Sequence, residues 1–235
     1  MTAGSWSVAR GLVIFDCDGV LVDSEPLACE VLRRAVAELG VRLNAEQVDQ
    51  HFRGRSLSDC ATIVGQMLGR AVPERFIEEL VRATDEAFVG RLKAVVGVAE
   101  LLTELRARRV AYCVASSGTL TKVKRSLQLT GLLEFFTESE VVGRLFSAEV
   151  VLMGKPAPDL FLHAAQVMGY APSSCVVIED SRAGVSAAVA AGMRAFGYAP
   201  GAPEYRRELE LMGATVVESM GEMSALLLGA LSPPR

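Results

Sequence analysis

Two aspartates, separated by a single residue, follow a short apolar segment near the start of the chain. Leu12–Phe15 is β-branched and aromatic, which predicts a buried strand, and Asp16 and Asp18 come directly after it. Residues two apart along an extended segment point the same way, so we expect both carboxylates to face one site. Two carboxylates held close together are costly unless a metal ion or a proton lies between them. The pattern therefore indicates chemistry at the end of this strand.

Three other polar segments accompany predicted strands or helices: Ser116-Ser117-Gly118, Gly154-Lys155-Pro156 and Glu179-Asp180. Each also has an ordinary structural interpretation, because serine and acidic residues favour helix N-termini and a lysine suits a turn. A calcium loop of the EF type does not fit the first aspartates. Such a loop requires glycine at its sixth position, whereas Gly19 stands at the fourth.

Strand-like and helical patterns alternate along most of the chain. The predicted strands are Leu12–Phe15, Val110–Ala115, Cys175–Ile178, Arg194–Gly197 and Thr215–Val217. The predicted helices are Val98–Arg108, Leu120–Leu127, Pro158–Met168, Gly184–Ala191 and Pro203–Met212. This alternation indicates an α/β fold, a Rossmann-like doubly wound parallel sheet covered by helices on both faces. The polar segments are then expected to meet at the carboxyl edge of the sheet.

One long interval breaks the alternation. Between residues 26 and 93 the pattern indicates amphipathic helices and no buried strand. Pro26 suits the first turn of one helix, Asn44 is a candidate cap for a second, and Pro73 opens a third. We therefore predict an α/β core formed by residues 1–25 and 94–235, with an all-helical cap domain, residues 26–93, inserted after the first strand.

Composition excludes several classes of protein. The 235 residues are 51% hydrophobic and carry a formal net charge of -4, which gives no general attraction to nucleic acid or to anionic membranes. No apolar stretch approaches the roughly 18–20 residues that span a bilayer. The five cysteines are scattered without metal-binding spacing, so we expect reduced thiols. We predict a cytoplasmic protein, a monomer or a weak dimer, whose partner is a small molecule.

The four polar segments, in this order and with an all-helical insert after the first, resemble the motifs of the haloacid dehalogenase superfamily. Within it the chain is similar to the phosphatase and β-phosphoglucomutase branch, which carries a small helical cap. The resemblance implies that Asp16 is a nucleophile that forms an aspartyl-phosphate and that Asp18 is the general acid and base. It also implies Mg²⁺, bound by the carboxylates of Asp16 and Asp180 and the backbone carbonyl of Asp18, with Glu179 assisting directly or through water.

The resemblance implies phosphate-binding groups as well. Lys155 would neutralise charge on the phosphate, and the Ser116 hydroxyl with the backbone near Ser117 and Gly118 would hold its oxygens. Glu25 and the segment Arg53-Gly54 of the predicted cap are further candidates for substrate binding.

Two departures from the branch bear on the reaction. Mutases of the β-phosphoglucomutase type carry a histidine and a basic residue at the positions that Ala28 and Leu57 occupy here. Dehalogenases of the superfamily lack the aspartate that corresponds to Asp18. We therefore expect a magnesium-dependent phosphatase acting on a small phosphorylated metabolite, a sugar or sugar-acid phosphate such as 6-phosphogluconate. A phosphomutase and a non-catalytic binding or regulatory protein on the same fold are the alternatives.

Overall fold

The computed structural model describes residues 11–52, 57–137 and 143–229, and these residues form two units. One unit contains the chain up to Val22 and from Ala94 onward, and the other is Asp23–Lys93. Each has a hydrophobic core of its own.

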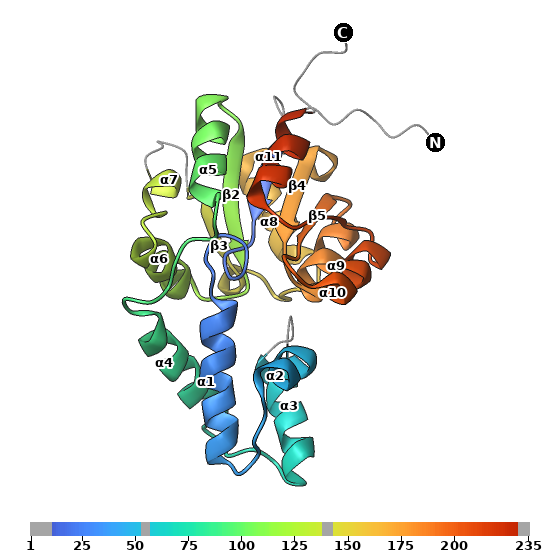
Figure 1. The fold of residues 1–235 in the computed structure, drawn as a ribbon. Coiled ribbons are helices and arrows are strands. Elements are labelled where there is room, and N and C mark those ends of the chain that lie inside the picture. Colours follow the sequence, from blue (N-terminus) through green and yellow to red (C-terminus); the bar gives the residue numbers. More distant parts are fainter. Residues whose placement is uncertain (1–10, 53–56, 138–142, 230–235) are drawn as a thin grey trace. The chain divides into compact units, whose positions relative to one another are not determined.

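Six parallel strands form the sheet of the first unit, in the order β3-β2-β1-β4-β5-β6 (Figure 1). They are β1 (Leu12–Phe15), β2 (Ala111–Ser116), β3 (Leu145–Ser147), β4 (Cys175–Glu179), β5 (Arg194–Tyr198) and β6 (Thr215–Val217). The chain proceeds from β1 to one edge and then returns to build the other half, which confirms the doubly wound α/β fold. The strand β3 was not predicted, because Leu145-Phe146-Ser147 contains no β-branched residue, whereas the equally short edge strand β6, Thr215-Val216-Val217, consists of them.

Helices cover both faces of this sheet: α5 (Val98–Ala107), α6 (Leu120–Leu129), α7 (Glu134–Thr137), α8 (Asp159–Met168), α9 (Arg182–Ala190), α10 (Pro203–Leu211) and α11 (Met220–Gly229). Helix α8 packs on β1 and β2, α9 on β4 and β5, and α10 on β5 and β6. On the other face, α5 packs on β2 and contacts α11 (Figure 1). Helices α7 and α11 were not predicted.

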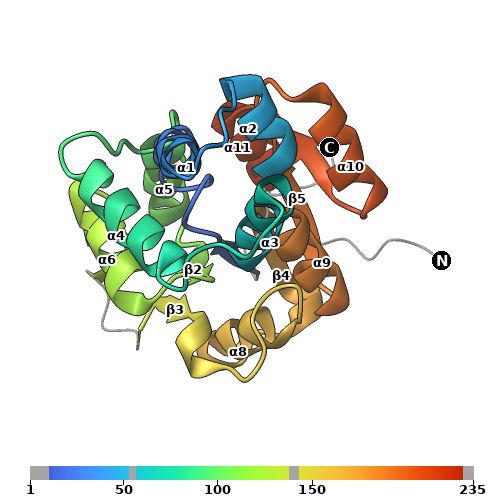
Figure 2. The same cartoon turned by 90° about the horizontal axis from the view of Figure 1, so that it is seen from below.

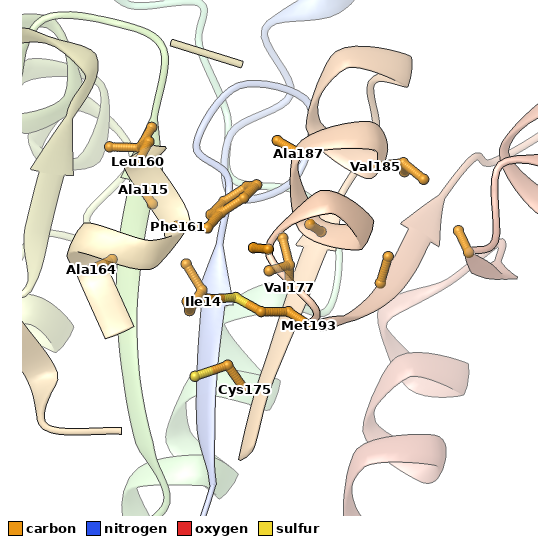
Figure 3. Close-up of a cluster of buried hydrophobic side chains, with 14 of the residues drawn as sticks. Ile14, Ala115, Leu160, Phe161, Ala164, Cys175, Val177, Val185, Ala187 and Met193 are labelled. Carbon is orange, nitrogen blue, oxygen red and sulfur yellow. The ribbon is translucent and has the colours of Figure 1, made fainter. Parts of the chain in front are cut away.

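Buried side chains hold the three central strands under α8 and α9. Ile14, Ala115 and Val177 come from β1, β2 and β4 and are fully buried (Figure 3). Phe161 of α8 and Val185 of α9 pack in the same cluster. Burying an aliphatic or aromatic side chain of this size stabilises the fold by about 1.5–3 kcal/mol. The ends of the central strands are therefore held in place.

The second unit is built from helices throughout its described residues: α1 (Glu25–Glu38), α2 (Ala45–Phe52), α3 (Leu57–Leu68) and α4 (Phe76–Phe88) (Figure 2). Helices α1 and α3 each pack against both α2 and α4, around a core that includes Val36, Val64 and Leu80. The predicted cap Asn44 accepts a hydrogen bond from the Gln47 N–H (2.8 Å), and the Gln47 side chain accepts one from the Asn44 N–H (3.0 Å). This reciprocal capping fixes the start of α2.

Among the helices described, none combines the length and the apolar character that a membrane span requires.

Candidate active site

The predicted acidic residues meet at the carboxyl edge of the sheet. Asp16 follows β1 and its N–H donates to the carbonyl of Ile178 (2.9 Å), which places it beside the end of β4. There, one carboxylate oxygen from each of Asp16, Glu179 and Asp180 lies within 4.8 Å of the others. Parallel neighbours that end at the same edge bring together residues more than 160 positions apart in the sequence.

Lys155 is the cation at the centre of this cluster. Its ammonium group donates to Asp16 Oδ1 (2.5 Å), to Glu179 Oε1 (2.6 Å) and to the carbonyl of Ala115 (2.9 Å). Its side chain is only 3% exposed, and its charge also lies over the ring of Phe161, 4.8 Å from the centroid. All three ammonium hydrogens are thereby occupied. Lys155 is placed to orient Asp16 and to supply positive charge.

The electrostatics of the Asp16–Lys155 pair follow from burial. Burial raises the pKa of Asp16, the positive charge of Lys155 opposes this, and the Glu179 and Asp18 carboxylates add to it, so that the pKa reaches about 7. Burial alone would lower the pKa of Lys155, but Asp16 and Glu179 outweigh it and raise the pKa above its ordinary value. Lys155 is therefore charged at neutral pH, whereas Asp16 is held close to its protonation equilibrium.

Both carboxylate oxygens of Glu179 accept hydrogen bonds from the protein. Its Oε2 accepts hydrogen bonds from the backbone N–H (2.9 Å) and the hydroxyl (2.8 Å) of Ser181, and its Oε1 accepts from Lys155. The carboxylate lies in a space that only glycine leaves open, because a Cβ at Gly184 of α9 would fall on it. Glu179 thus anchors Lys155 to the start of α9.

The backbone of Asp180 is held by a hydrogen bond from α10. The Tyr205 hydroxyl donates to the backbone carbonyl of Asp180 (2.8 Å), and the Arg182 guanidinium lies over the Tyr205 ring. A Cβ at Gly19 would fall on the Asp180 carboxylate, and Gly19 has φ of +74°, which favours glycine. The glycine after the aspartate pair therefore makes room for Asp180.

Asp18 has a partner that the sequence analysis did not find. Lys122 of α6 donates to Asp18 Oδ2 (2.7 Å), and the two side chains are 30% and 29% exposed. Burial alone would lower the pKa of Lys122, but the Asp18 carboxylate raises it above its ordinary value. A signal was available, because lysine in the first turn of a helix opposes the helix dipole and calls for a local carboxylate or anion.

The remaining predicted residues have different positions. Ser116 ends β2 and is buried, and its hydroxyl accepts a hydrogen bond from the Gly118 N–H (3.2 Å), while Ser117 is exposed. Glu25 is the first residue of α1, in the helical unit, and its part in substrate binding stays a prediction. Arg53 and Gly54 lie outside the described residues.

The residues present fit a divalent cation. The carboxylates of Asp16, Glu179 and Asp180 bring one oxygen each within 4.8 Å of the others, a spacing that one ion can bridge. Carboxylate oxygens are the ligands that hard divalent cations prefer. The space that Gly19 leaves for Asp180 is consistent with a preformed site for such an ion.

The fold and this edge together define an α/β enzyme with an acidic centre beside a buried lysine. Residues 11–192 match the model of the haloacid dehalogenase-like hydrolases, and the chain belongs to this family. The resemblance inferred from the motifs is thereby confirmed, and the protein is a hydrolase.

Two named phosphatases and one crystal structure are similar to this chain. The chain is 32% identical over 185 residues to 6-phosphogluconate phosphatase of Escherichia coli, with 78% of this chain and 80% of that protein covered. It is 31% identical over 182 residues to a phosphorylated carbohydrates phosphatase of Thermotoga maritima, covering 77% and 81%. A crystal structure of a HAD family hydrolase from Deinococcus radiodurans, with bound phosphate and sodium, superposes with a TM-score of 0.79 at 32% identity and covers 97% of this chain and 100% of that one.

Proposed function

We propose that the protein is a magnesium-dependent phosphatase that hydrolyses a small phosphorylated metabolite, a sugar or sugar-acid phosphate, through a covalent phosphoenzyme at Asp16. The observation that carries this proposal is the buried Lys155, which donates to both Asp16 and Glu179 at the carboxyl edge of the sheet. The names of the relatives, which include 6-phosphogluconate phosphatase, support the substrate class.

Asp16 is the nucleophile of the proposed first step. Lys155 holds Oδ1 of Asp16, which leaves Oδ2 to attack phosphorus. The bond from Oδ2 to phosphorus forms as the bond from phosphorus to the ester oxygen breaks, and a proton from Asp18 passes to the departing alkoxide. The Ser116 hydroxyl and the backbone after β2 bind the phosphate oxygens.

Water completes the reaction. Asp18, now a carboxylate, takes a proton from a water molecule whose oxygen bonds to phosphorus, and the bond to Asp16 breaks to release inorganic phosphate. Asp16 and Asp180, with the carbonyl of Asp18, would hold Mg²⁺, with Glu179 in support. When bound, the ion offsets the repulsion between the Asp16 carboxylate and the dianionic ester. The protein groups supply mainly positioning and charge, which are the main requirements of phosphoryl transfer.

A phosphate-release screen with Mg²⁺ across sugar phosphates, sugar-acid phosphates including 6-phosphogluconate, and nucleotides tests this proposal. We expect hydrolysis of at least one sugar or sugar-acid phosphate, its loss on chelation of the metal, and its abolition in Asp16→Asn, which keeps the shape of the side chain. Mass spectrometry of the acid-quenched wild type during turnover is expected to show one phosphoryl group, absent from the variant. Retained turnover in Asp16→Asn, or an isomerised phosphate without free phosphate, would contradict it.

A further inference from the structure

The two oxygens of the Asp18 carboxylate have different surroundings. Oδ2 accepts the hydrogen bond from Lys122 (2.7 Å). Oδ1 is buried, and no described residue forms a hydrogen bond with it. A buried carboxylate oxygen without a donor is unfavourable unless another group completes it. One oxygen is thus anchored by the protein, and the other is left for a group that the protein itself does not provide.

Lys122 is held in place by the start of α6. Thr119 caps the helix by accepting the Lys122 N–H (3.2 Å), and the Glu149 carboxylate accepts the N–H of Leu120 (2.8 Å). Glu149 is itself held by the hydroxyl of the buried Ser147 at the end of β3 (3.1 Å). The helix terminus is therefore capped by Thr119 and tied to the end of β3 through Glu149, so the lysine on its first turn has a defined position.

The local helix gives no reason for a lysine at this place. A positive charge in the first turn faces the positive end of the helix dipole, which costs about 0.3–1 kcal/mol at an exposed site. The first turn of α6 contains no acidic residue to compensate. The Asp18 carboxylate across the site is the favourable partner, so the position of Lys122 is best explained by Asp18.

We propose that Lys122 is a positioning residue for the proton transfers of Asp18. Lys122 holds Oδ2, so that the carboxylate cannot rotate and Oδ1 faces the reacting oxygen. Oδ1 then delivers the proton to the leaving alkoxide in the first step and receives one from water in the second. This inference rests on the proposed phosphatase function. Proton transfer needs heavy atoms about 2.6–3.2 Å apart, so a free carboxylate would reach that geometry less often.

Leaving groups of different basicity separate this role from others. An alkoxide leaving from a sugar phosphate needs the proton, whereas p-nitrophenolate leaves readily without it. For Lys122→Met we expect kcat/KM to fall by about 10–100-fold with the best sugar phosphate and by less than about threefold with p-nitrophenyl phosphate. Lys122→Arg, which keeps a charged donor, is expected to recover most of the loss. Lys124→Met, on the same helix but exposed, is the matched control and is expected to match the wild type.

A double-variant cycle with Asp18→Asn completes the test. If Lys122 acts through Asp18, adding Lys122→Met to Asp18→Asn causes no further loss of kcat/KM with the sugar phosphate. Equal losses with both substrates, independent effects in the cycle, or a rise of KM alone would overturn the proposal, because Lys122 would then contact the substrate itself. Failure of the wild type to hydrolyse any phosphate ester would instead refute the proposed function.

Discussion

Two lysine–carboxylate pairs lie at the carboxyl edge of the sheet, and they differ in their access to solvent. Lys155 is 3% exposed, and its ammonium group donates to two carboxylates and a backbone carbonyl. Lys122 is 30% exposed and joins a carboxylate of which one oxygen is without a partner among the described residues. The first pair is buried and has every donor used, whereas the second pair is partly exposed and leaves one oxygen of Asp18 without a donor from the described part of the protein. This difference supports the roles proposed for the two pairs, fixed charge for the first and proton transfer for the second.

The largest expected effect comes from removing the sealed cation. Lys155→Met leaves the Asp16 and Glu179 carboxylates buried without their common partner, so we expect the free energy of unfolding to fall by about 3–5 kcal/mol. We expect kcat/KM to fall by about 10²–10³-fold with sugar phosphate and p-nitrophenyl phosphate alike, because the lost charge acts on the phosphoryl group whatever the leaving group. Denaturant unfolding and phosphate release measure the two quantities. A loss confined to the sugar phosphate would mean that the two lysines do not differ in the way inferred here.

Substitutions at two helical glycines test whether Glu179 holds Lys155 in place. A Cβ at Gly184 would fall on the Glu179 carboxylate, so Gly184→Ala displaces the group that holds Lys155. We expect a decrease of about 10–100-fold in kcat/KM and a loss of about 1–3 kcal/mol in unfolding free energy.

Gly221→Ala in α11 is the matched control for Gly184→Ala. Its Cβ would lie 3.8 Å from the nearest atom, the Ser219 hydroxyl oxygen, which is an ordinary contact. Alanine in a helix is favoured over glycine by up to about 1 kcal/mol, so this variant is expected to keep full activity and to be slightly more stable. Equal behaviour of the two variants in both assays would contradict the anchoring role of Glu179.

The pH dependence of metal binding reports on Asp16. Burial, partly opposed by Lys155, raises the pKa of Asp16 to about 7, so below that pH a cation must displace a proton. We expect the dissociation constant for Mg²⁺ to be about tenfold larger at pH 6 than at pH 8, measured by calorimetry. Asp16→Asn is expected to bind Mg²⁺ more weakly, with this difference removed.

The raised pKa of Asp16 also makes the stability of the metal-free protein depend on pH. Since the folded state retains a proton that the unfolded chain releases, the contribution of Asp16 to stability is greatest below its ordinary pKa of 3.8 and declines as the pH rises toward 7. Metal-free wild type is therefore expected to lose stability relative to Asp16→Asn over that interval, as thermal unfolding at several pH values would show. A difference that stays constant with pH would contradict the raised pKa.

The smallest expected effect tests whether α10 supports the metal site through Tyr205. Tyr205→Phe removes the hydroxyl that donates to the Asp180 carbonyl, a bond of about 1 kcal/mol. We expect Mg²⁺ to bind roughly fivefold more weakly, measured by the rise of the melting temperature on titration. Tyr170→Phe removes a hydroxyl from a tyrosine that packs against the same core, and is expected to leave Mg²⁺ binding unchanged. Equal affinities in the two variants would show that α10 does not support the metal site.

Much of the fold was predictable because its signals are local. The apolar runs of β1, β2 and β4 are buried on both faces and therefore stand out in the sequence, and the abrupt change to Asp16 marks where β1 ends. The strand β3 was missed because it is short and has no β-branched residue, whereas the equally short edge strand β6 is Thr-Val-Val.

The sequence predicted where the acidic residues of the candidate site lie, but it did not predict which lysine pairs with which carboxylate. Residues at strand ends can be placed at one edge from the α/β pattern alone. The partner of Asp18 is 104 positions away on the first turn of α6, and no period in the sequence connects the two. That all the ammonium hydrogens of Lys155 are occupied also depends on Ala115 and Glu179 from two different strands.

The amino-acid sequence by itself determined the doubly wound sheet, the helical insert and the edge at which the acidic residues gather. These follow from hydrophobic period and from where apolar runs stop, which are properties of neighbouring residues. Only the tertiary structure decided which lysine faces which carboxylate and how deeply each pair is buried. The physical reason is that ion pairing and desolvation depend on distances of a few ångströms between segments far apart in the chain, and those distances exist only once the sheet and its helices have packed.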